Sequence, residues 1–116
     1  MYKQYIYLVI SILFFTFNCN SVLASDKNLN EAIQHAEAAV IAKDGKYIAE
    51  NALVAKEYAN VIKESMKSLS SPGAGDNDLD SAIKYLDQAI EKGNQEDTQT
   101  AKIAAENAVQ FLKRLE

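Results

Sequence analysis

The chain has 116 residues, 48% of them hydrophobic, with 12 basic and 16 acidic side chains and a net charge of −4. This length supports one hydrophobic core rather than two domains, and the acidic balance argues against nucleic acid, whose binding depends on Lys and Arg neutralising phosphates. With one histidine and one cysteine, and no Ser/His/Asp set, phosphate loop or HExxH motif, we predict that the protein is not an enzyme.

The amino-terminal segment has the pattern of a secretory signal peptide. Lys3 supplies the positive region, residues 6–17 form an apolar run, and Ala24 is a small residue at a suitable cleavage position. We therefore predict that residues 1–24 are removed when the protein is exported across the inner membrane. The mature domain is then 25–116.

Two alternatives concern the same segment. Its apolar run is shorter than the roughly 20 residues that a membrane-spanning helix needs, so we expect no stable membrane anchor after cleavage. Cys19 raises the possibility of a lipid anchor, but a lipidated cysteine normally follows a small residue, and here Asn18 precedes it.

The remainder of the chain contains an internal repeat. Residues 29–40 read LNEAIQHAEAAV, and residues 79–90 read LDSAIKYLDQAI. A second pair, AENAL at 49–53 and AENAV at 105–109, follows the first. Self-similarity of this kind, with separations of 50 and 56 residues, indicates a duplicated structural unit. We place the first repeat at about 28–69, the linker at 70–78 and the second repeat at about 79–115.

Each repeat has the apolar spacing of two helices. In the first helix, Leu29, Ile33, Ala36 and Val40 recur at steps of four, three and four, as a core-facing helix requires. Asn28 followed by Glu31 resembles a capping box. A second helix extends from about residue 46 to residue 69, and its many alanines favour a helix over a strand.

The second repeat begins after the linker, where Pro72 ends any continuing helix. A third helix starts near Leu79, with Gly93 at its carboxyl end, and Thr98 is the expected N-cap of a fourth. No segment alternates with a period of two. We therefore predict an all-α fold, an antiparallel up-down-up-down four-helix bundle built from a duplicated helical hairpin. The predicted core comprises Ile33, Val40, Leu53, Ile62, Ile83, Leu86, Ile90, Ala108 and Leu112.

An acidic cluster at the start of the third helix has some of the spacing of a calcium loop. Asp76, Asp78 and Asp80 fall on positions 1, 3 and 5 of an EF-hand, but Ser81 takes the place of the required Gly and Asp87 that of the bidentate Glu. Because the repeat predicts a helix here, we interpret the cluster as helix-capping charge at the positive end of the dipole.

His35 is the only histidine, and Glu31 lies one turn before it. Side chains at i and i+4 share a helix face, so both could contact one metal ion. The alternative is an ordinary solvated pair, because two ligands alone do not hold a metal selectively.

The sequence also resembles the small metal-binding protein family. Residues 30–40 are similar to the opening helix of that family, and residues 82–90, Gly93 and 105–109 are similar to its second half. The resemblance implies a small periplasmic four-helix protein that binds divalent metals such as copper and nickel through many histidines.

Among the positions at which the family carries histidine, only His35 is retained here. The others hold Tyr47, Tyr85, Lys92, Asp97, Ala104 and Phe111. The resemblance therefore implies weak binding of a divalent metal through His35, with Glu31 and Asp97 as further candidate ligands. The alternative is a non-enzymatic structural, protein-interaction or stress module that has lost metal binding, with a protein partner that the sequence does not identify.

We expect the exported protein to begin at Ser25. The intact mass of the periplasmic protein, measured by mass spectrometry, tests this expectation. A mass that still includes residues 1–24, or that includes a lipid on Cys19, would contradict it.

Overall fold

The structure is a computed structural model that describes residues 24–68 and 75–116. The predicted signal peptide, apart from Ala24, lies outside these residues, as do Cys19 and Pro72. The described residues form four helices and no strand: α2 (Ala24–Ile41), α3 (Gly45–Ser68), α4 (Gly75–Asn94) and α5 (Thr98–Lys113). The predicted all-α four-helix fold is confirmed. None of the described helices has the length and hydropathy needed to cross a membrane.

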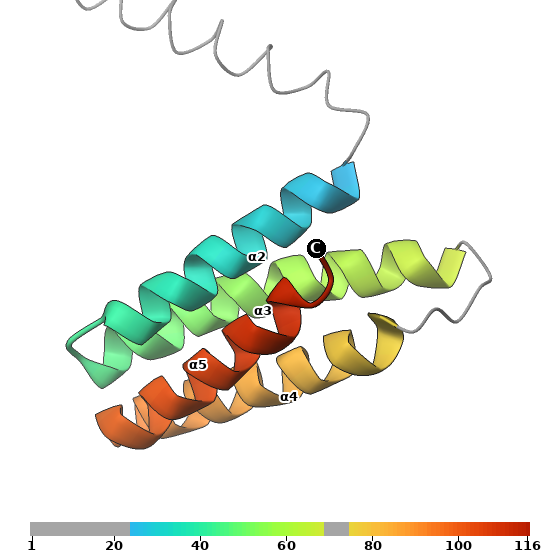
Figure 1. The fold of residues 1–116 in the computed structure, drawn as a ribbon. Helices are drawn as coiled ribbons and strands as arrows, with labels where there is room; N and C mark the ends of the chain where they lie inside the picture. The colour runs from blue at the N-terminus through green and yellow to red at the C-terminus, as the bar shows by residue number, and fades with distance from the viewer. Residues whose placement is uncertain (1–23, 69–74) are drawn as a thin grey trace, which may run out of the picture.

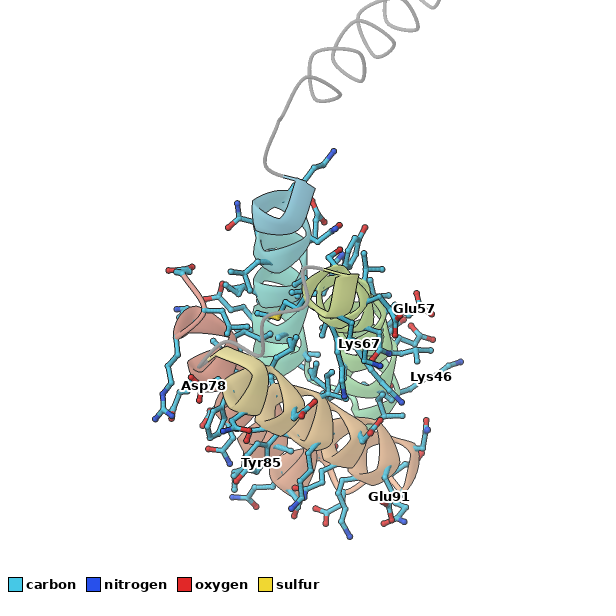
Figure 2. The ribbon with its side chains drawn as sticks, turned by 90° about the vertical axis from the view of Figure 1, so that its right-hand side faces the viewer. Lys46, Glu57, Lys67, Asp78, Tyr85 and Glu91 are labelled. Atoms are coloured by element: carbon cyan, nitrogen blue, oxygen red, sulfur yellow. The ribbon has the colours of Figure 1, made fainter. Side chains whose placement is uncertain are left out.

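The four helices pack side by side around a common centre (Figure 1). Each helix contacts the next one along the chain, and α5 returns to contact α2. Viewed with the right-hand side turned forward, α2 lies beside α3 and α5 lies beside α4 (Figure 2). Lys56 of α3 pairs with Asp87 of α4 at 2.6 Å, and Lys63 pairs with Asp80 at 2.7 Å. Because residue numbers rise along α3 as they fall along α4, these two helices have opposite directions.

The core of the bundle consists mainly of alanine. Only four large side chains are fully buried in the described residues, namely Ile48, Leu79, Leu86 and Leu112. Small side chains allow neighbouring helices to approach closely, and alanine also has the highest helix propensity. The buried alanines are Ala32, Ala36, Ala39, Ala49, Ala52, Ala55, Ala59, Ala82, Ala89, Ala101, Ala104, Ala105 and Ala108.

Backbone contact replaces side-chain contact where the start of α3 crosses the end of α4. A Cβ atom added to Gly45 would lie 2.5 Å from the carbonyl oxygen of Gly93, and a Cβ added to Gly93 would lie 2.5 Å from that of Gly45. Such distances are well inside van der Waals contact, so a side chain at either position would force the helices apart. The two glycines therefore permit this crossing.

The predicted core is correct at its centre and wrong at one position. Five of the predicted residues are buried, and three more are half-buried against the core. Leu53 is wrong, because 46% of it is exposed. The buried face of α3 is set by Ala52 and Ala55, and Leu53 lies outside that face. The buried residues are Ile33, Ile62, Leu86, Ala108 and Leu112, and the half-buried ones are Val40, Ile83 and Ile90.

Helix starts differ from the sequence prediction in two places. Since α2 begins at Ala24, Asn28 lies inside the helix and is not its N-cap. Since α4 begins at Gly75, the whole calcium-like register from Asp76 to Asp87 is helical. A continuous helix cannot wrap its side chains around a calcium ion as an EF-hand loop does, which supports the interpretation of the acidic cluster as charge at a helix start.

Two leucine-to-alanine substitutions test the register of the bundle. Leu86→Ala should lower the free energy of unfolding by about 2–5 kcal/mol, because it removes a fully buried side chain and leaves a cavity. Leu53→Ala, on the outer face of α3, should change it by no more than about 0.5 kcal/mol. Urea unfolding followed by circular dichroism measures both. Equal losses in the two variants would contradict the observed register.

Candidate metal site

His35 and Glu31 lie one turn apart on α2, and the structure brings their side chains together. The distance from His35 Nε2 to Glu31 Oε2 is 3.8 Å, and the two side chains are 35% and 34% exposed. Both residues adjoin buried alanines in the sequence, Ala32 and Ala36, and both are themselves half-buried. The pair presents one nitrogen and one carboxylate on a partly open surface.

Tyr58 of α3 stacks on the imidazole. The two ring centroids are 6.0 Å apart and the ring planes differ by 11°. Aromatic rings in this offset arrangement attract one another, so the contact limits the orientations that His35 can adopt. No sequence pattern indicates this pair, because the spacing within one helix does not reveal which residue of the neighbouring helix lies opposite.

The second hairpin has an aromatic pair of its own. Tyr85, fifty residues after His35 in the chain, stacks on Phe111 with centroids 5.6 Å apart and planes that differ by 15°. The guanidinium of Arg114 lies 4.7 Å from the centroid of Phe111 and 3.6 Å from the carboxylate of Asp78. A tyrosine thus takes the place of the imidazole, and the second hairpin offers packing rather than a nitrogen ligand at this position.

Asp97, the third predicted ligand, has a structural role at the start of α5. Its Oδ1 accepts a hydrogen bond from the backbone N–H of Thr100 at 3.3 Å, which makes Asp97 the N-cap. The prediction of Thr98 as the cap is therefore wrong by one residue. Glu96, just before the cap, has a φ of 62°, a left-handed conformation that is uncommon for residues other than glycine.

The structure does not bring Asp97 to His35 and Glu31. Across residues 24–68 and 75–116, no group of three or more His, Cys, Asp and Glu side chains is arranged to hold a metal ion. The pair on α2 still fits a divalent ion in donor chemistry, since imidazole and carboxylate suit copper and nickel. Its two donors would have to be supplemented by water or by ligands from outside the described residues.

Comparison with known proteins identifies the family. The model of the small metal-binding protein family matches residues 2–115. The chain belongs to the small metal-binding protein family. The match extends over all four described helices and confirms the resemblance seen in the sequence. No curated protein and no solved structure matches the chain. The family is one of metal-binding proteins rather than of enzymes, and its description names no particular metal.

Two substitutions of Asp97 separate its capping role from a ligand role in this member of the small metal-binding protein family. Asp97→Ala should lower the free energy of unfolding by about 1 kcal/mol through loss of the cap. Asp97→Asn should keep most of that stability, because asparagine also caps helices well. Thermal unfolding measures this difference. Both variants lose the carboxylate, so a fall in copper affinity in both would show that Asp97 is a ligand after all.

Proposed function

We propose that this protein is a periplasmic, non-enzymatic binder of one divalent metal ion, with copper preferred over nickel. The observation that carries the proposal is the contact between His35 and Glu31 on the open side of α2, in a chain that belongs to a metal-binding family. The export pattern of residues 1–24 supports a location in the periplasm.

The donor set favours copper and limits its affinity. Copper(II) heads the affinity series of the divalent first-row metals and accepts nitrogen and oxygen ligands, so it is the ion best held by one imidazole and one carboxylate. Two protein ligands leave most of the coordination sphere to water. We therefore propose weak, readily reversible binding, suited to buffering or temporary sequestration of the metal.

Three residues have distinct parts in this proposal. The neutral imidazole of His35 supplies the nitrogen, and the carboxylate of Glu31 supplies an oxygen and offsets part of the metal's charge. Tyr58 holds the imidazole plane from the neighbouring helix, as groups around a metal ligand commonly do. No step beyond binding and release is implied.

Calorimetric titration of tag-free protein with copper(II), and separately with nickel(II), tests the proposal. We expect one weak copper site, no detectable site in His35→Ala, and a loss of about tenfold in affinity, or about 1.4 kcal/mol, in Glu31→Gln. Glu50→Gln, which removes an exposed carboxylate from α3, is the matched control and should bind like the unaltered protein.

Two results would overturn this assignment. Unchanged copper binding in His35→Ala would show that the imidazole is not involved. Several tight sites in the unaltered protein would show that the surface carboxylates, rather than the pair on α2, provide the binding.

A further inference from the structure

A groove lies between α2 and α5, away from the pair at His35 and Glu31. It has a volume of about 310 Å³, and it is lined by residues from 37–41 of α2 and from 106–110 of α5. This seam is also the least extensive contact between neighbouring helices of the bundle. The lining residues are Glu37, Val40, Ile41, Glu106, Val109 and Gln110.

The floor and one end of the groove are apolar. Val40 of α2 and Val109 of α5 both pack against the core and are half-buried. Ile41 is 78% exposed at the end of α2, and Ile103, one turn before Glu106 on α5, is 54% exposed. Scattered apolar residues are normal on a protein surface, but Ile41 lines the same groove as Val40 and Val109.

The ionisable side chains that line the groove are both acidic. Glu37 is paired with Lys113 at 3.5 Å, but both side chains are about half exposed, and an exposed pair of this kind is worth little. A cation from outside can therefore compete for Glu37. In the described part of the chain, no ion pair engages Glu106. The net charge of the whole chain is also negative, so the groove attracts positive charge.

The charge of the groove lining distinguishes between two possible occupants, a second copy of this chain and a basic partner. A second copy of the chain related by a two-fold axis would present the same patch from both sides, so Glu37 and Glu106 of each copy would bring four carboxylates to one interface. A partner with lysine or arginine beside apolar side chains would satisfy both the floor and the acidic walls. A helix can present both kinds of side chain, because its apolar residues recur at i, i+3, i+4 and i+7 along one face.

We propose that the α2–α5 groove is a docking site for a basic amphipathic helix of another protein. The apolar face of that helix would cover Val40, Ile41 and Val109, while its flanking cations would contact Glu37 and Glu106. The site is independent of the proposed metal pair, because His35 faces α3 through Tyr58 whereas the groove faces α5. Occupation of one site need not alter the other.

The test uses a synthetic helical peptide with leucine along one face and lysine on both flanks, and a matched peptide in which glutamate replaces lysine. Each is titrated into ¹⁵N-labelled protein. We expect the lysine peptide to shift the amide signals of Val40, Ile41, Glu106 and Val109, and the glutamate peptide to shift none of them.

Variants localise the binding. Ile41→Ser and Glu106→Lys should each lower the affinity for the lysine peptide by about tenfold, the size of a modest hot spot. Leu53→Ser and Glu50→Lys make the same kinds of change on α3 and should leave its affinity unchanged. All four positions are exposed, so the variants should fold, and circular dichroism verifies this. His35→Ala should bind the peptide normally, which separates this test from that of the metal site.

Three outcomes would overturn the proposal. Equal binding of both peptides, or shifts spread over the whole acidic surface, would show that the groove is not a specific site. Equal weakening by the α3 variants would place the binding elsewhere. Shifts of the groove amides on raising the protein concentration alone would assign the groove to a second copy of the chain.

Discussion

The close approach of the helices is the constraint on which the rest of this structure depends. Alanine occupies most buried positions, so the distance between neighbouring helices is set by methyl groups rather than by long side chains. At the crossing of Gly45 and Gly93 even the methyl groups are absent and the two backbones are in contact. A bundle packed in this way tolerates few large residues inside, and among the residues that the structure describes only Ile48, Leu79, Leu86 and Leu112 are large and fully buried.

Because the core consists mainly of alanine, the polar side chains that could bind a ligand lie on the outer surface. No polar or charged residue is buried in the described part of the chain, since a narrow alanine interior offers neither room nor hydrogen-bond partners to a ligand side chain. His35 and Glu31 accordingly lie at the edge of the α2–α3 contact, and Glu37 and Glu106 at the edge of the α2–α5 contact. A metal held at such an edge stays in contact with water, which favours exchange over permanent retention.

The sequence predicted the helices and the family well, because apolar periodicity and the quoted family residues are local signals. The sequence prediction failed where the answer depended on which of two neighbouring residues takes a given position in the structure. Leu53 was predicted to lie in the core, yet Ala52 and Ala55 form the buried face of α3 and Leu53 is exposed. Thr98 and Asp97 are both good caps, and only the contact of Asp97 with the Thr100 N–H identifies which of them is used. The Tyr58 contact with His35, and the remoteness of Asp97 from it, depend on the register between helices, which no local pattern contains.

The alanine interior has a thermodynamic consequence beyond its geometry. The heat capacity change of unfolding grows with the apolar surface that becomes exposed to water, and averages about 12–15 cal/mol/K per residue in globular proteins. An alanine exposes less apolar surface than a leucine or isoleucine, so this bundle should have a heat capacity change at or below the lower end of that range. A small heat capacity change flattens the dependence of stability on temperature. The protein would then retain a nearly constant, moderate stability over a broad range of temperature, including in the cold, where proteins with larger apolar cores lose more of theirs.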